Sequence, residues 1–166
     1  MSIEPVDSSQ IKPLHPVNLL RQYLEKKKNQ PLHSTAGRID LIEISPLLPW
    51  LILIEDKGLG TDIDFWVKFA GPAIAGLIGI DPTGLRINDG LPKKLAGEIR
   101  RECLHAQLSK KPRYSIDEFK IAGMSKKQVY QSVHPLSKSA GMTIDQLIWT
   151  MAPGDIEIEF TRDDAP

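Results

Sequence analysis

The chain has 166 residues, which is enough for one compact hydrophobic core and too few for two ordinary domains. Hydrophobic residues make up 41% and charged residues 25%, a globular composition, and 21 basic residues balanced by 21 acidic ones give no reason to expect a nucleic-acid partner. The single cysteine excludes an intramolecular disulfide, and the longest apolar run, 47–54, is far shorter than the roughly 20 residues of a membrane span. We therefore expect one cytoplasmic domain without a membrane partner.

The amino-terminal part is expected to form a flexible leader, 1–15, followed by an amphipathic helix over 17–28 that opens the domain 16–152. Pro16 suits the first turn of this helix because its missing N–H is not needed there, and the lysines at 26–28 complement the helix dipole at the other end. One helical face is shared by Val17, Leu20 and Leu24. The helix needs an apolar surface to lie against.

Two strands come next, over 50–56 and 61–70, and a glycine-containing turn between them predicts a β-hairpin. The first strand has apolar residues on both faces, which are Trp50, Ile52 and Ile54 on one and Leu51 and Leu53 on the other. A strand of this kind is covered on both sides. In the second strand apolar and polar residues alternate, and the expected core face is formed by Ile63, Phe65, Val67 and Phe69.

Helices are predicted at 73–78 and at about 92–110, and the second presents four cations to water, Lys93, Lys94, Arg100 and Arg101. Three more strands are expected, over 113–122, 126–136 and 142–152, with connectors of hairpin length. The remaining residues, 153–166, alternate apolar residues with acids. They are expected to form either an acidic tail or an additional edge strand.

Several segments together resemble a known superfamily. They are Arg38-Ile39-Asp40, Leu47-Leu48-Pro49, the run from Phe65 to Gly71, Thr83-Gly84, His134-Pro135-Leu136-Ser137 and Ile144-Asp145-Gln146-Leu147-Ile148. Their order and spacing resemble the PAS domain superfamily, and in particular the stand-alone PAS-like proteins of alphaproteobacteria. The sequence departs from that pattern at Lys68, where arginine is usual, and at Pro72, where threonine is common. Lysine lacks the planar fork needed for a bidentate contact.

This resemblance implies an α+β fold, with a five-stranded antiparallel sheet, short helices and one longer helix on one face, and the N-terminal amphipathic helix in addition. It implies a sensory or interaction module in bacterial signal transduction, which binds a small ligand or a partner protein and has no catalytic activity. We expect no output domain within 166 residues, so that any output passes to another protein.

A candidate apolar pocket between the sheet and the helices follows from the expected inward faces. Its candidate residues are Phe65, Val67, Phe69, Ile74, Leu77, Ile78, Leu95, Ile99, Cys103, Tyr114 and Tyr130, the tyrosines being its polar groups. The same residues would fill a solid core equally well, and the sequence leaves both alternatives open. No cofactor is expected, with His105, beside the apolar face of the long helix, as an optional haem ligand.

The opposite sheet face also carries apolar side chains, and burying each contributes about 1.5–3 kcal/mol. The candidate docking face for the N-terminal helix consists of Val17, Leu20, Leu24, Leu51, Leu53, Trp66 and Trp149. We expect a homodimer in which this helix and the sheet face of the two subunits meet. Packing of the helix within its own chain is the alternative.

No sequence motif for catalysis or metal binding is present, and the histidines His15, His33, His105 and His134 lack the spacing of metal ligands. His15 and His33 are expected in solvated or structural loop positions. Two other functions compete with a sensory module. One is a cone-shaped α+β enzyme or carrier resembling steroid isomerases, with Asp64 or Asp145 as a base in an apolar pocket. The other is a structural adaptor with a filled core and no ligand.

Overall fold

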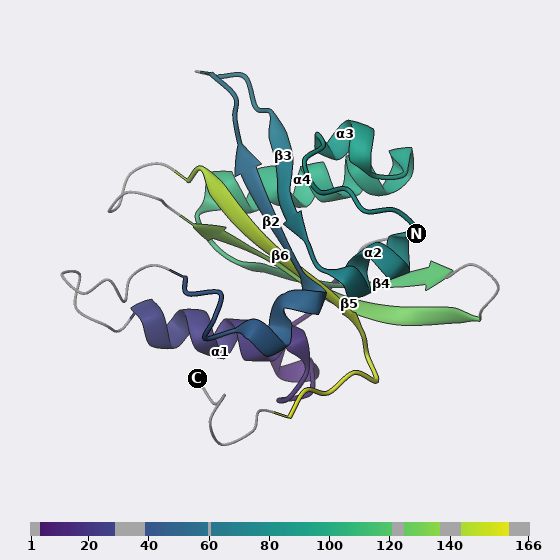
Figure 1. The fold of residues 1–166 in the computed structure, drawn as a ribbon. Coiled ribbons are helices and arrows are strands. Elements are labelled where there is room, and N and C mark those ends of the chain that lie inside the picture. Colours follow the sequence, from purple (N-terminus) through teal and green to yellow (C-terminus); the bar gives the residue numbers. More distant parts are fainter. Residues whose placement is uncertain (1–3, 29–38, 60, 121–124, 137–143, 160–166) are drawn as a thin grey trace.

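The computed structural model describes residues 4–28, 39–59, 61–120, 125–136 and 144–159. These residues form an α+β fold built on a six-stranded antiparallel sheet with the strand order β1-β4-β5-β6-β2-β3 (Figure 1). The strands are β1 (Glu4–Pro5), β2 (Leu51–Asp56), β3 (Phe65–Ala70), β4 (Arg113–Lys120), β5 (Lys126–Leu136) and β6 (Gln146–Pro153). Strands β2 to β6 are the five predicted from the sequence, and the two-residue β1 adds a sixth at one edge.

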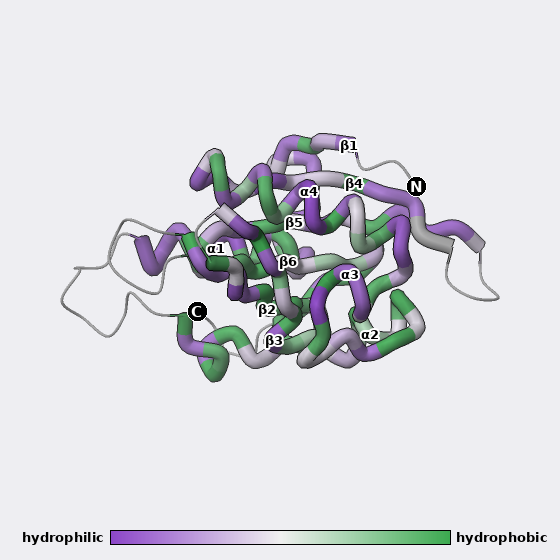
Figure 2. Tube along the Cα trace, turned by 90° about the horizontal axis from the view of Figure 1, so that it is seen from above, coloured by the Kyte–Doolittle hydropathy of each residue, from purple (hydrophilic) through white to green (hydrophobic). Residues whose placement is uncertain are grey.

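Helices cover both sides of the sheet. Helix α1 (Pro16–Lys28) lies on one side, and α3 (Ile87–Gly90) and α4 (Lys93–Ser109) lie on the other (Figure 1). The shorter elements are α2 (Pro72–Ile78) and the 3-10 helices η1 (Ser8–Gln10) and η3 (Ser45–Trp50). Figure 2 shows hydrophilic and hydrophobic residues alternating along α1 and α4, as expected for helices with one face on a sheet. Within the described part of the chain, no helix is long and apolar enough to cross a membrane.

Each face of the sheet has its own hydrophobic cluster. We call the face towards α4 the inner face and the face towards α1 the outer face. In β2, Leu51 belongs to the outer cluster and Ile52 to the inner one. In β6, Ile148 belongs to the outer cluster and Trp149 to the inner one. This confirms the prediction, drawn from period-two alternation in β2, that the sheet is buried on both sides.

A β-bulge in β3 changes which face the end of that strand presents. The register against β2 shifts between Val67 and Phe69, so that Lys68 is the extra residue. Phe69 therefore pairs with Leu53 of the outer face, whereas Phe65 and Val67 remain in the inner cluster. Strict alternation assigns Phe69 to the inner face, and this assignment is wrong because the bulge interrupts the period of two.

The residues before α1 pack against the sheet, although the sequence predicts a flexible leader there. Strand β1 pairs with β4, the Val6 N–H donates to the Tyr114 carbonyl at 3.1 Å, and Ile11 is buried. At the other end of the domain, residues 154–159 form no strand, and the Ile158 N–H donates to the Leu14 carbonyl at 2.9 Å. The two ends of the described chain thus support each other beside α1.

Candidate functional site

The inner face of the sheet holds most of the residues predicted to line a pocket. Each of six is at most 3% exposed and belongs to the inner cluster, namely Phe65, Val67, Ile74, Leu95, Ile99 and Cys103. Leu77 and Ile78 of α2 pack against that cluster. Burial raises the pKa of the Cys103 thiol above its usual range, which keeps the thiol protonated and weakly nucleophilic. In the structure these side chains pack together as a core.

Three of the predicted pocket residues lie on the outer face instead. Phe69 is there because of the bulge at Lys68. Tyr114 contacts the His134 ring edge to face, with the ring centres 5.6 Å apart, and Tyr130 contacts His15 in the same way, also at 5.6 Å. The prediction that the two tyrosines supply polar groups to an inner pocket is therefore wrong, because alternation along β4 and β5 turns both towards the α1 side.

Polar side chains are buried on the inner face as well. Arg113 Nε donates to Glu102 Oε2 of α4 at 2.6 Å, and Trp149 Nε1 donates to Gln131 Oε1 at 3.1 Å. Asp117, only 2% exposed, accepts a hydrogen bond from the Glu118 N–H at 2.7 Å. These hydrogen bonds compensate part of the cost of placing polar groups inside the protein.

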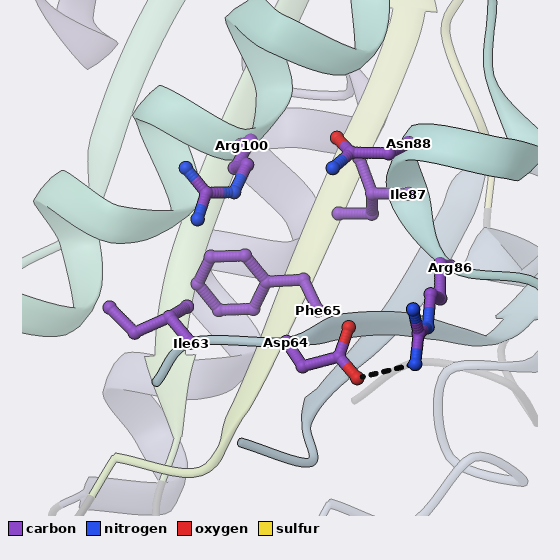
Figure 3. A pocket seen from close by; sticks show the side chains of 7 residues that line it. All are labelled: Ile63, Asp64, Phe65, Arg86, Ile87, Asn88 and Arg100. Carbon is purple, nitrogen blue, oxygen red and sulfur yellow. Dashed lines mark ion pairs between the residues drawn. The ribbon is translucent and has the colours of Figure 1, made fainter. Parts of the chain in front are cut away.

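A small cleft opens between the beginning of β3, α3 and the middle of α4 (Figure 3). It measures about 60 Å³ and is lined by Ile63, Asp64, Phe65, Arg86, Ile87, Asn88 and Arg100. Figure 3 shows the Phe65 ring between Arg100 on one side and the pair of Asp64 and Arg86 on the other; the charged atoms of that pair are 3.5 Å apart. Pockets for drug-sized ligands measure about 300–1,000 Å³. The cleft therefore suits a single small group. Because its lining has two guanidinium groups, of Arg86 and Arg100, and only one carboxylate, of Asp64, an anionic group is favoured.

Asp64, a candidate base of the enzyme alternative, lies at this cleft and not in an apolar pocket. Its Oδ2 accepts a hydrogen bond from Trp66 Nε1 at 2.9 Å and faces Arg86, and its side chain is 35% exposed. The other candidate, Asp145, is half-buried just before β6. A surface carboxylate with N–H and guanidinium partners lacks the apolar surroundings that such a base requires.

The outer face is covered by α1 of the same chain. Its buried cluster consists of Leu19, Leu20, Tyr23, Leu24, Ile44, Leu47, Leu51 and Ile148, with Leu53 packed against it. Val17 is also fully buried. The homodimer predicted from the sequence depends on this face being open to a second subunit. Since the chain's own helix occupies it, that argument for a homodimer fails, and the alternative of packing within one chain is observed.

Neither of the two tryptophans assigned to this docking face belongs to the cluster under α1. Trp149 is fully buried in the inner cluster, because its pairing partner in β2 is the inner-face residue Ile52. Trp66 is half-exposed on β3, with Lys57 Nζ 4.6 Å and the Arg86 guanidinium 5.3 Å from its ring centre. The partners of Trp66 are thus these two cations and Asp64, to which its indole N–H donates, and none of them belongs to α1.

His15 connects the beginning of α1 to the end of β6. Its Nδ1 accepts a hydrogen bond from the Val17 N–H at 3.2 Å, and its Nε2 lies 3.0 Å from the Pro153 carbonyl oxygen. An acceptor at Nδ1 and a donor at Nε2 define the neutral imidazole with its proton on Nε2. Burial lowers the pKa of His15, although the Pro153 carbonyl opposes this by favouring the protonated ring. His15 therefore caps the helix in its uncharged form.

Asn18 provides a second connection at the same end of α1. Its Nδ2 donates to the carbonyl of Ile11 at 2.7 Å and approaches those of Ser8 and Lys12 at 3.2 and 3.1 Å. Its Oδ1 accepts from Arg21 Nε at 3.1 Å. A polar residue in the first turn of a predicted helix is a recognisable sign of such bonding, but the sequence does not show which carbonyls it reaches.

His134 is buried on the outer face of β5. Its Nε2 lies 3.1 Å from Ser132 Oγ, and its ring contacts Tyr114. Burial, together with the positive charges of Lys28 and Arg21, lowers the pKa of His134 to about 3. Two neutral histidines thus lie between the sheet and α1 or its N-terminal connection.

The remaining histidines form no buried site. His105 is exposed on α4, so it cannot act as a buried haem ligand, and this option from the sequence is wrong. His33 lies outside the described residues. Among the residues that the structure describes, no three His, Cys, Asp or Glu side chains are grouped to hold a metal ion.

Comparisons with known proteins agree with this architecture. No protein-family model and no curated protein sequence matches the chain. Among solved structures, the PAS domain of BvgS from Bordetella pertussis is similar, with a TM-score of 0.50 and 19% identity over 74% of this chain and 85% of that one. VqmA from Vibrio cholerae, solved in a complex with ligand and DNA, has a TM-score of 0.52 and 17% identity over 70% of this chain. The alignment spans 52% of VqmA, about half its length. The protein therefore has a PAS-like fold.

Proposed function

We propose that this protein is a non-catalytic PAS-type sensory or interaction module of signal transduction, in which binding of a small ligand or a partner protein changes the docking of α1. The PAS-like fold supports the class of module. The observation that carries the proposal is the docking of α1 on the outer face, through an apolar cluster and the hydrogen bonds of His15 and Asn18.

The strands offer a direct physical connection between the two layers. In β2 and β6, consecutive residues such as Ile148 and Trp149 contact the α1 layer and the α4 layer respectively. A shift of these strands on one side therefore changes the packing on the other. A ligand or partner shifts the position of α1 only by its difference in affinity for the docked and undocked arrangements.

A structural adaptor is the second candidate, and the packed inner core favours it. An adaptor of this kind binds its partner without any small molecule. The two candidates share the fold and differ in whether binding changes the docking of α1, so hydrogen exchange over that helix separates them.

The test combines native mass spectrometry with hydrogen exchange on protein purified from its own host. One sample is left untouched, and a second is unfolded, dialysed and refolded. For a ligand-binding sensor we expect a mass difference between the samples and faster amide exchange over residues 16–28 after stripping. For a partner-binding module we expect a co-purifying protein whose addition changes exchange in the same segment. Equal masses, no partner and identical exchange in α1 would contradict the proposal.

A further inference from the structure

Helix α4 separates its charges by face. Its two acids, Glu98 and Glu102, are turned towards the sheet and are only 9% exposed each. Glu102 pairs with Arg113 of β4, so it does not neutralise the helix's own cations. The exposed face carries Lys93, Lys94, Arg100 and Arg101, and none of these four forms an ion pair within the described part of the chain.

The stability of the helix does not require these cations where they are. Lys93 and Lys94 occupy the first turn of α4, which has no acidic residue. The helix dipole places partial positive charge at this end, so a cation there is unfavourable by a few tenths of a kcal/mol or more. Residues that destabilise the helix in which they lie are expected at functional positions.

Gly97 is another residue on the same exposed face that does not favour the helix. Glycine inside a helix is less stable than alanine because it loses more backbone freedom on folding. A Cβ added at Gly97 would meet no atom within 4 Å, and its backbone is not left-handed, so the fold itself does not demand glycine. What the glycine provides is a shallow place where another chain can approach the helix backbone.

Apolar side chains continue from this glycine along the helix. Positions 97, 104 and 108 lie on one side of an α-helix by its 3.6-residue repeat. Leu104 is half-buried, and Leu108 is 74% exposed. With 3.6 residues per turn, Lys93 and Arg100 border one edge of this stripe, and Lys94 and Arg101 border the other. The exposed face is therefore a narrow apolar stripe between two rows of positive charge.

The cleft described above adjoins one of these rows. Arg100 lines it together with Arg86 and Asn88 (Figure 3). A carboxylate is the group that guanidinium and amide N–H donors recognise, and a cleft of about 60 Å³ admits one such group.

We propose that the exposed face of α4, formed by Lys93, Lys94, Gly97, Arg100, Arg101 and Leu108, docks an acidic amphipathic segment of a partner protein. Apolar side chains of the segment cover the stripe, its carboxylates face the two rows of cations, and one carboxylate enters the cleft. The chain has no net charge, so its overall charge gives no general attraction for acidic partners. An apolar stripe between the cations favours an amphipathic peptide over the continuous phosphate backbone of a nucleic acid. This inference goes beyond the proposed function, because the same face would serve a sensor or an adaptor.

The test uses the full chain and a fluorescent peptide as long as α4, 17 residues, with leucines at helical spacing and glutamates beside them. Fluorescence anisotropy measures binding of this peptide, of a version with lysine in place of glutamate, and of a random-sequence DNA duplex. We expect binding of the acidic peptide alone, weakened by roughly tenfold or more between about 0.05 and 0.5 M salt.

Three variants locate the site. Arg101→Glu and Gly97→Leu are expected to weaken binding by roughly tenfold or more. Lys26→Glu, a charge reversal on the exposed side of α1, is the matched control and is expected to leave binding unchanged. Gly97→Leu separates docking from folding, because a Cβ at this exposed position meets no atom within 4 Å and a better helix former should keep or raise the melting temperature.

Four results would overturn the inference. They are no binding of the acidic peptide, equal binding of the DNA duplex, unchanged binding by Gly97→Leu, and concentration-dependent self-association that Arg101→Glu abolishes in analytical ultracentrifugation. The last result would assign the face to a second copy of this chain. Since none of these measurements depends on α1, failure here leaves the proposed function to be decided by its own test.

Discussion

The two faces of the sheet are buried by different means. The inner cluster is large and mainly apolar, and it includes residues of four strands and three helices. The outer cluster is smaller and is accompanied by directional hydrogen bonds: Tyr23 donates to Glu43 at 2.9 Å and Thr150 to the Trp50 carbonyl at 2.8 Å, besides those of His15 and Asn18. Apolar packing is non-directional, whereas hydrogen bonds fix one geometry and depend on protonation. The inner face therefore supplies most of the stability, and the outer face specifies one docked position of α1.

The largest effect is expected on the inner face. Trp149→Ala removes a fully buried aromatic side chain and leaves Gln131 Oε1 without its donor. The free energy of unfolding should fall by about 3–5 kcal/mol. Urea denaturation followed by circular dichroism measures it, and Trp149→Phe, which keeps most of the volume, should lose less. A loss below about 1 kcal/mol would show that the inner face does not dominate stability.

A pH effect is expected on the outer face. His134 stays neutral in the folded protein down to a pKa of about 3, whereas the unfolded chain takes up a proton near pH 6.5. The contribution of His134 to the free energy of unfolding is therefore fully present above pH 6.5. Below that pH the free energy of unfolding should fall by up to about 1.4 kcal/mol per pH unit. Denaturation at pH 7 and pH 5 measures the slope, which carboxylate protonation affects little in that range.

The variants His134→Gln and His15→Gln show whether the buried histidines cause this pH dependence. Each removes one buried imidazole, and each should flatten the pH dependence relative to the unmodified protein, because the pKa of both groups is lowered on folding. His105→Gln, an exposed position on α4, is the control and should leave the slope as it is. An unchanged slope in both of the buried variants would contradict neutral histidines at this interface.

A smaller effect is expected at Asn18. Asn18→Ala leaves the Ile11 carbonyl without its 2.7 Å donor and should cost about 1–3 kcal/mol. Gln22→Ala, whose exposed amide makes only a 3.4 Å contact, should cost less than about 0.5 kcal/mol. Limited proteolysis between residues 4 and 15 gives a local measurement. Equal resistance of the two variants would show that Asn18 does not hold this segment.

Much of this architecture follows from local sequence patterns. Alternation in β2 separates Leu51 from Ile52, and the order of strands and helices indicates the PAS-like fold. Local patterns fail where long-range geometry decides. The bulge at Lys68 places Phe69 on the outer face instead of the inner one, and the pairing of β6 with β2 places Trp149 on the inner face.

The site depends even more on contacts between distant residues. His15 bonds to Pro153, 138 residues away, and the cleft combines residues of β3, α3 and α4. No local pattern contains such information. The apolar face of α1 fits its own sheet and another subunit's equally well, because burial of hydrophobic area is indifferent to which chain supplies it.

The most direct test of the account is native-state hydrogen exchange of Leu20→Ala against Ile42→Ala. Leu20 lies on the sheet-facing side of α1 and is fully buried, whereas Ile42 is 83% exposed. If α1 is a separable layer, Leu20→Ala should accelerate exchange over residues 16–28 by about 30-fold or more, the equivalent of about 2 kcal/mol, while β5 and β6 keep their protection. Equal acceleration in α1 and in both strands, or no acceleration in α1, would contradict it.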